Sequence, residues 1–164
     1  MLKMLIVVMG VAGSGKTTLG RALASALDED FWDADDFHSA YCKEKMRTGQ
    51  RISAEDRRDW VNRIVDLARK QVGRTVVLAC SALRAETRDQ LCIAAVCHKL
   101  IFLRGTYSEI YPKLAVRTQH YFSPVLLESQ FDDLEEPEDA LLLQCYQPLT
   151  TLVSLSLDHI NRHQ

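Results

Sequence analysis

A phosphate-binding loop near the N-terminus constrains this chain more than any other feature. Residues 10–17 read Gly-Val-Ala-Gly-Ser-Gly-Lys-Thr and fit the pattern G-x-x-x-x-G-K-S/T. They follow an apolar run of strand length, residues 4–9, and precede an amphipathic run that predicts a helix over residues 17–27. Glycines let such a loop turn its backbone N–H groups toward an anion, and the helix start adds its positive dipole end. We expect this loop to bind nucleotide phosphates through Gly10, Val11, Ala12, Gly13, Ser14, Gly15, Lys16, Thr17 and Thr18.

Two side chains of the loop have expected chemical roles. Lys16 can reach the β- and γ-phosphates, and the hydroxyl of Thr17 is placed to ligate Mg²⁺. An ordinary glycine-rich turn could match the same pattern by chance. The strand before the loop and the helix after it favour the phosphate-binding interpretation.

Length and charge narrow the classes of protein. The chain has 164 residues, 47% of them hydrophobic, which suits a single domain with one core. The net charge of -2 and the pI near 6.2 argue against nucleic acid or an anionic membrane as a partner, so phosphate binding must be local.

The cysteines point to a reducing compartment. There are five of them, they contain no C-x-x-C pair, and most lie in apolar surroundings, so we expect buried thiols without disulfides or zinc. The first apolar run is short and lacks a cleavage pattern. We therefore expect no signal peptide, no membrane span and a cytoplasmic protein.

Strand-length apolar runs alternate with helical patterns along the chain. Strands are expected at residues 4–9, around 31–32, and at 75–80, 99–103 and 141–143. Helices are expected at residues 17–27, 39–47, 53–71, 84–95, 107–117, 124–134 and 148–160. This alternation predicts an α/β P-loop NTPase fold of three layers, a five-stranded parallel sheet with helices on both faces.

Two stretches interrupt the alternation, at about residues 37–59 and 118–139. Ligands of open α/β sheets bind beyond the carboxyl ends of the strands. We expect these insertions to overhang the phosphate loop as a substrate clamp and a lid, within one domain spanning residues 1–164.

The second strand ends in a run of acids. Strand alternation would place Asp33 and Asp35 on the same side, near the phosphate loop. Phosphoryl transfer needs such carboxylates, one beside hydrated Mg²⁺ and one to orient or deprotonate the attacking hydroxyl. Alternatively the acids cap the next helix, as Asp36 could. His38 either donates to a substrate oxygen or packs locally.

The third strand ends at Cys80-Ser81, without the acid that a motor or switch ATPase usually presents there. This absence favours a small-molecule kinase. Arg84 and Arg88 follow four residues apart, on one helix face directed toward the same cleft. They either bind an anion or are solvated.

The last third of the chain holds three further candidates. Arg117 is the best candidate for a lid arginine that meets the charge of the transferring phosphoryl group. Gln147 and Pro148 follow the fifth strand, where small kinases usually place the adenine ring. The acidic run over residues 132–139 is interpreted as a solvated edge with no assigned role.

Together these residues resemble the gluconate kinases, P-loop kinases of the shikimate-kinase-like type, over about residues 9–148. The phosphate loop is shared by many enzymes, whereas two other strings are more specific. The first is Cys80-Ser-Ala-Leu83 with Arg88-Asp89. The second is His120-Tyr-Phe followed by Leu126-Leu127, Ser129-Gln-Phe131, Leu134-Glu135 and Pro137.

The resemblance implies ATP-dependent phosphorylation of D-gluconate to 6-phospho-D-gluconate with Mg²⁺, often in a homodimer. It implies that Asp35 faces the substrate hydroxyl and that Asp33 belongs with Thr17 to the metal shell. The candidate substrate-binding residues are Asp35, His38, Arg57, Ser81, Arg84, Arg88 and His120.

The chain also departs from the family pattern. Cys42 stands where the family usually has asparagine, Arg51 replaces proline and Thr87 replaces tyrosine. Two hydrogen-bonding groups expected near the sugar acid are thereby lost. Two alternatives therefore stay open: a kinase of another small sugar acid or polyol, and a nucleotide-binding regulator without turnover.

Overall fold

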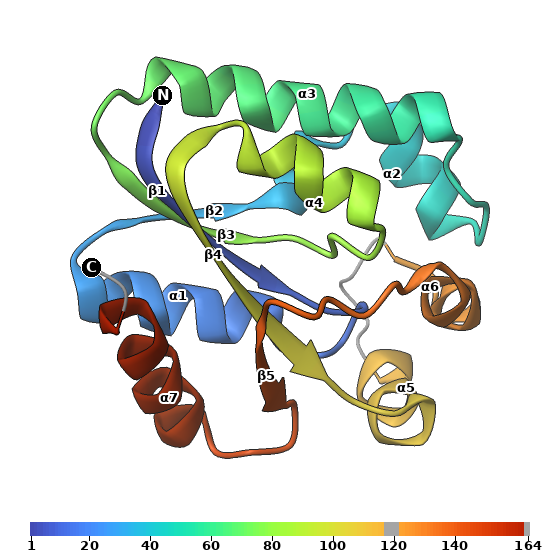
Figure 1. The fold of residues 1–164 in the computed structure, drawn as a ribbon. Coiled ribbons are helices and arrows are strands. Elements are labelled where there is room, and N and C mark those ends of the chain that lie inside the picture. Colours follow the sequence, from blue (N-terminus) through green and yellow to red (C-terminus); the bar gives the residue numbers. More distant parts are fainter. Residues whose placement is uncertain (117–121, 163–164) are drawn as a thin grey trace.

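The computed structural model describes residues 1–116 and 122–162. At its centre lies a five-stranded parallel sheet with the strand order β2-β3-β1-β4-β5 (Figure 1). The strands are β1 (Leu2–Met9), β2 (Asp30–Asp33), β3 (Thr75–Ala79), β4 (Ala95–Arg104) and β5 (Leu141–Gln144). Because β1 pairs with both β3 and β4, the loop that follows it leaves from the middle of the sheet's carboxyl edge.

Helices cover both faces of the sheet. On one face lie α3 (Ala54–Lys70) and α4 (Ala85–Cys92), and on the other lie α1 (Lys16–Leu27) and α7 (Leu149–Asn161) (Figure 1). Leu5 and Val7 of β1 pack with the buried side of α3, whereas Ile6 and Val8 pack with the buried sides of α1 and α7. Strand residues alternate between faces, so a strand buried on both sides reads as a continuous apolar run.

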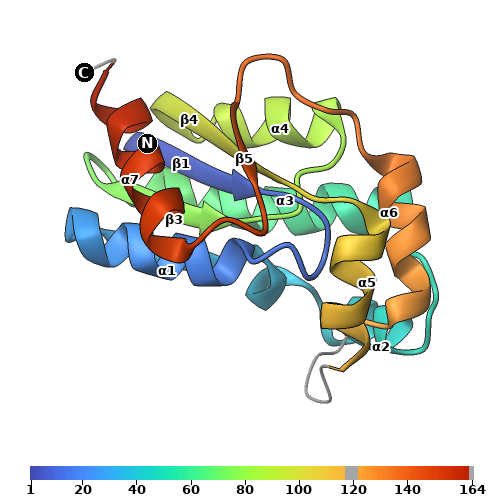
Figure 2. The same cartoon turned by 90° about the horizontal axis from the view of Figure 1, so that it is seen from below.

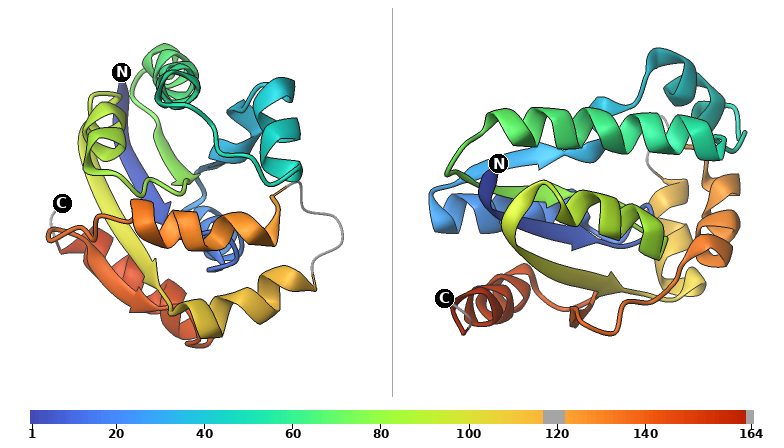
Figure 3. Two further views of the ribbon diagram at one scale, coloured as in Figure 1. Left: turned by 90° about the vertical axis from the view of Figure 1, so that its right-hand side faces the viewer. Right: turned by 45° about the horizontal axis from the view of Figure 1, so that its top comes forward.

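The remaining elements gather at the carboxyl end of the sheet (Figures 2 and 3). They are η1 (Ala34–Phe37), α2 (Ala40–Arg47), α5 (Tyr107–Ala115), η2 (Pro124–Leu126) and α6 (Leu127–Asp133). A third apolar cluster, which includes Met46, Leu83, Ile110 and Leu126, joins α2, α5, η2 and α6 to the phosphate loop. The insertions are therefore tied to the sheet edge from which the loop emerges.

Helix starts follow local capping chemistry. Ser53 and Asp56 form a reciprocal capping box at the start of α3, and the Ser39 side chain accepts a hydrogen bond from Cys42 N at the start of α2. The sequence had left open whether Asp36 caps the next helix, and the structure shows that it does not cap α2. Ser39 occupies that position instead.

The predicted fold class is confirmed, but several element boundaries differ, most of all where α4 gives way to β4. Helix α4 ends at Cys92 rather than at residue 95, and β4 begins at Ala95 rather than at residue 99. Ala94 N donates to Leu91 O and closes the helix, and Ala95 then pairs with Leu2 of β1. Pairing with β1 therefore places residues 95–98 in the strand, although their local pattern also suits the end of a helix.

Two further expectations concern the cysteines and the membrane. All five cysteines are free thiols, but only Cys42 and Cys80 are buried, so the expectation of buried thiols was wrong for the other three. Across residues 1–116 and 122–162, no helix is long and apolar enough to cross a membrane.

Candidate active site

The phosphate loop needs glycine at two positions for different reasons. Gly10 has φ of +152°, and a Cβ there would lie 2.7 Å from Leu103 O and from Ser14 Oγ. Gly15 begins α1 in the left-handed region, with φ of +98°. A side chain would obstruct the first position and strain the second. The loop therefore presents its backbone and the start of α1 to the cavity described below.

Hydrogen bonds connect the loop to the end of β2. Thr17 Oγ1 donates to Asp33 Oδ2 at 2.8 Å, and Asp35 N donates to Asp33 Oδ1 at 3.1 Å. Lys16 Nζ donates to Val11 O at 2.9 Å. Asp33 is the last residue of β2 and the cap of η1, so Asp35 lies on η1 and not on the strand. The argument from strand alternation was therefore wrong, although both carboxylates line the same cavity.

One large cavity opens at the carboxyl edge of the sheet. Its lining combines residues of the phosphate loop, η1, α3, the β3–α4 connection and α6. Of the predicted site residues, it is lined by Ala12, Gly13, Gly15, Lys16, Thr17, Thr18, Asp33, Asp35, His38, Arg57, Ser81 and Arg84. The phosphate cradle and most of the candidate substrate-binding residues thus share one cavity.

His38 forms a buried part of the cavity wall. Its ring stacks on Trp60, with centroids 4.3 Å apart, and Trp60 Nε1 donates to Ala34 O at 2.6 Å. Burial, then the charges of Lys43 and Arg63, lower the pKa of His38 to about 4. Within the described part of the chain, His38 Nδ1 is buried without a hydrogen-bond partner. His38 is therefore a neutral group at neutral pH that can exchange a hydrogen bond with a ligand.

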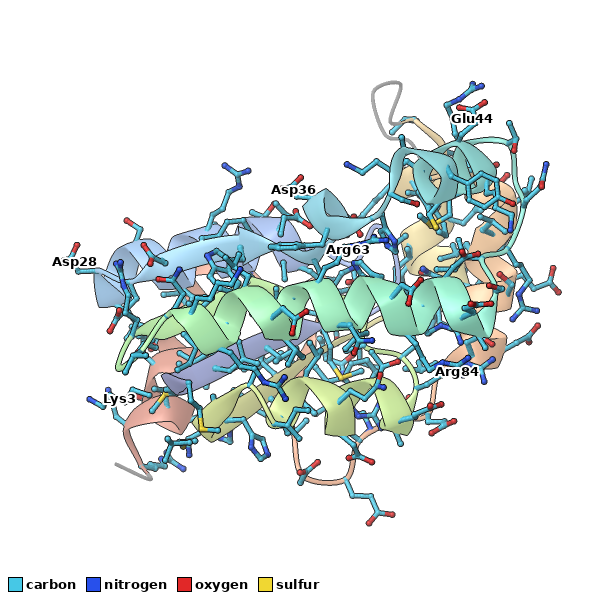
Figure 4. All side chains as sticks on the ribbon, turned by 90° about the horizontal axis from the view of Figure 1, so that it is seen from above. Lys3, Asp28, Asp36, Glu44, Arg63 and Arg84 are labelled. Atoms are coloured by element: carbon cyan, nitrogen blue, oxygen red, sulfur yellow. The ribbon has the colours of Figure 1, made fainter. Side chains whose placement is uncertain are left out.

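Three arginines, Arg51, Arg57 and Arg84, also line the cavity. Arg84 Nη2 and Arg51 Nη2 both donate to Asp133 Oδ1, at 2.6 and 2.8 Å. Burial and the neighbouring Arg84 lower the pKa of Arg57, against the opposing effect of Asp133. Figure 4 shows Arg84 at the end of the molecule that carries Glu44 of α2, far from Lys3 and Asp28. This cluster makes one end of the cavity a receptor for anions.

Other predicted residues lie away from the cavity surface. Arg88 is not among the described residues that line it. Its Nη1 donates to Ala82 O and Leu83 O, at 2.9 and 3.0 Å, and so braces a loop in which Ala82 has φ of +43°. The expected contact between Arg88 and the substrate stays a prediction, because its guanidinium bonds to carbonyls of the β3–α4 connection and lies outside the described lining of this cavity.

The predicted adenine-binding residues and part of the phosphate loop also lie outside the described lining of the cavity. Gln147 Oε1 accepts from Gln144 N at 3.1 Å, and Pro148 caps α7. Neither residue belongs to the described cavity lining, nor do Gly10, Val11 and Ser14, of which Val11 and Ser14 are buried. Arg117 and His120 fall outside the described residues.

Sequence reasoning missed three cavity residues. Gln130 Oε1 accepts from Ala12 N at 2.6 Å, which ties α6 to the phosphate loop across 118 residues. Arg51 and Asp133 were also given no role. The interpretation of residues 132–139 as a solvated edge was wrong for Asp133. Its side chain is 17% exposed and accepts hydrogen bonds from two arginines. The spacing of Leu127, Gln130 and Asp133 along one side of α6 was the available signal.

One departure from the family pattern matters less than expected. Cys42 is buried in the apolar cluster of Met46 and Leu126, away from the described cavity lining, whereas Thr87 does line the cavity. Of the three departures, Arg51 and Thr87 therefore change the polar lining, and Cys42 does not.

The donor set suits a hard cation. No group of three or more His, Cys, Asp or Glu side chains gathers as a metal site in residues 1–116 and 122–162. Magnesium, however, usually takes one or two protein oxygens and completes its shell with phosphate and water. The Thr17 hydroxyl and the Asp33 carboxylate, already in contact, fit that requirement.

Comparisons with known proteins identify the family to which the chain belongs. A family model described as "Shikimate kinase" matches residues 12–156. The chain is 40% identical over 148 residues to a gluconokinase of Arabidopsis thaliana, covering 81% of this chain and 78% of that protein. It is 32% identical over 162 residues to the thermoresistant gluconokinase of Escherichia coli, covering 95% and 93%.

A solved structure is similarly close. The crystal structure of a gluconokinase from Sinorhizobium meliloti superposes with a TM-score of 0.84 at 34% identity, covering 96% of this chain and 91% of that one. The family model covers most of the chain, and the Escherichia coli and Sinorhizobium meliloti proteins match 95% and 96% of it. The chain therefore belongs to the shikimate kinase family and, within it, to the gluconokinases.

Proposed function

We propose that this protein transfers the γ-phosphoryl group of ATP to D-gluconate and releases ADP and 6-phospho-D-gluconate. The observation that carries the proposal is a single cavity whose lining combines the phosphate cradle, the carboxylates of Asp33 and Asp35, and the arginine cluster of Arg51, Arg57 and Arg84. Phosphoryl transfer depends on positioning and charge stabilisation, and these three parts supply both. The gluconokinase relatives, which cover most of the chain, support the choice of acceptor.

At the nucleotide end, the loop amides and Lys16 would hold the β- and γ-phosphates. On productive binding, Lys16 Nζ would exchange its bond to Val11 O for phosphate oxygens. Thr17 and Asp33 would hold Mg²⁺, which neutralises phosphate charge as it develops. Asp33 would thus organise both the metal shell and, through its bond from Asp35 N, the next carboxylate.

At the acceptor end, Arg57 would bind the carboxylate of the sugar acid. A linear polyhydroxy acid needs one such cation and several hydrogen-bonding groups for its hydroxyls. Ser81 and neutral His38, which both line the cavity, supply such groups. Asp35, 4.0 Å from His38 Nε2, would accept the hydrogen bond of the attacking hydroxyl and take its proton late in the transfer.

Several parts of the proposal depend on the sequence alone. Residues 37–59 would act as a clamp and residues 118–139 as a lid, within one domain over residues 1–164. Arg117 would meet the transferring phosphoryl group when the lid closes, and His120 would approach the sugar acid. Gln147 and Pro148 would approach the adenine through backbone. A homodimer and a cytoplasmic location also stay predictions.

An acceptor panel tests the proposal. ADP release is measured with Mg·ATP and D-gluconate, other aldonates, shikimate, nucleoside monophosphates or no acceptor. Selective turnover of D-gluconate is the expected result. Turnover of a different sugar acid would favour the alternative that Thr87 and Arg51 motivate. ATP binding without turnover of any acceptor would favour a regulator.

A further inference from the structure

Two of the three cavity arginines share one carboxylate. Arg51, Arg57 and Arg84 line the cavity, and Asp133 lies among them. The same atom, Asp133 Oδ1, accepts from Arg84 Nη2 at 2.6 Å and from Arg51 Nη2 at 2.8 Å. The substrate-free site therefore carries its own anion.

Long-range folding places this anion. Asp133 is the last residue of α6, Arg84 caps α4 and Arg51 lies in the connection between α2 and α3. The Asp133 side chain is 17% exposed, against 39% for Arg84 and 54% for Arg51. Because α6 fixes the carboxylate, the two longer side chains converge on it rather than the reverse.

Asp133 does not neutralise the whole positive charge of the arginine cluster. Arg57 has no ion pair among the described residues, and Arg84 Nε is buried there without a hydrogen-bond partner. Asp133 offsets one of the three guanidinium charges. Its bonds engage both Arg51 and Arg84, so Arg57 is the one arginine of the three without an ion pair among the described residues, and it suits one further carboxylate.

We propose that Asp133 is the internal counter-ion of the acceptor site and restricts that site to acids with a single carboxylate. The inference rests on the proposed function, which assigns Arg57 to the carboxylate of the sugar acid. A second carboxylate would have to displace Asp133 from Arg51 and Arg84, and Asp133 is tethered at the site. Asp133 is thus a specificity-determining residue of the acceptor site.

Isothermal titration without nucleotide or metal tests the inference. Malonate is the dicarboxylate probe, acetate the monocarboxylate probe and D-gluconate the proposed acceptor. Asp133→Asn keeps the size and one oxygen of the side chain but removes its charge. We expect this variant to bind malonate roughly tenfold more tightly than the wild type, with changes of about threefold or less for acetate and D-gluconate.

Two controls locate the effect. Asp132→Asn removes a charge from an exposed neighbour on the same helix and should leave all three affinities unchanged. In the double variant Asp133→Asn with Arg51→Gln, most of the gain for malonate should disappear. Asp133→Ser, which removes the charge with a smaller side chain, should repeat the gain and replaces the Asn variant if that one does not fold.

The outcomes separate the inference from the proposed function. An unchanged malonate affinity in both Asp133 variants, or an equal gain for acetate and malonate, would overturn the inference. Wild-type protein that binds no D-gluconate, together with a malonate gain in Asp133→Asn, would contradict the proposed acceptor and leave the counter-ion standing.

Discussion

His38 makes the stability of this protein depend on pH in a predictable direction. The residue is 9% exposed and stacked on Trp60. Burial, then Lys43 and Arg63, lower its pKa from 6.5 to about 4 in the folded protein. Between these two values the unfolded chain binds a proton that the folded protein does not. Stability is therefore lost as the pH falls from about 6.5 toward 4 and is unaffected by this group above that range.

The size of the effect follows from the two pKa values. Going from pH 7 to pH 5, protonation of His38 in the unfolded chain alone lowers the free energy of unfolding by about 2 kcal/mol. His38→Gln removes that contribution and leaves the titration of the other groups in place. The loss of stability between pH 7 and pH 5 should therefore be about 2 kcal/mol smaller in the variant than in the wild type.

Urea unfolding followed by tryptophan fluorescence at the two pH values measures this difference. Comparing each protein with itself cancels the cost of losing the stacking on Trp60. His98→Gln, which replaces an exposed histidine, should retain the wild-type pH dependence. If His38→Gln and the wild type lose the same stability between pH 7 and pH 5, the argument about His38 is refuted.

Two further substitutions test the site. Asp35→Asn should lower kcat by on the order of a hundredfold while the ATP dissociation constant changes by about threefold or less. Steady-state kinetics and nucleotide titration check this, and unchanged turnover would remove Asp35 from the mechanism. Gln130→Leu leaves Ala12 N without its acceptor, whereas Gln130→Glu retains one. The Leu variant should therefore be less stable than the Glu variant by about 1–2 kcal/mol in urea unfolding, and equal stability would show that the bond contributes nothing.

The parts of the structure that local sequence determines were predictable. The phosphate loop combines residue types that serve one purpose at fixed spacing, and its flanking strand and helix follow the apolar pattern on both sides. Capping residues such as Ser53 similarly mark helix starts within a few positions. The sheet and its helical layers follow because strands alternate with helices along the chain.

The parts of the structure that depend on contacts between distant segments could not be predicted from the sequence. Arg88 looked like a substrate ligand because of its spacing from Arg84, but the β3–α4 loop takes its guanidinium. Asp133 looked like one more exposed acid, yet its partners lie 49 and 82 residues away. Neither pairing leaves a periodic signal in the sequence. Side-chain partners across a cavity are set by packing, and only the fold reveals them.

The central claim is that one cavity brings the phosphoryl group of ATP to a hydroxyl of D-gluconate. The most direct test is to incubate the wild-type protein with Mg·ATP and D-gluconate, identify the products by phosphorus NMR and mass spectrometry, and measure ATP binding in parallel. The account predicts ADP and 6-phospho-D-gluconate in equal amounts. A protein that binds ATP but forms no phosphorylated gluconate would contradict it.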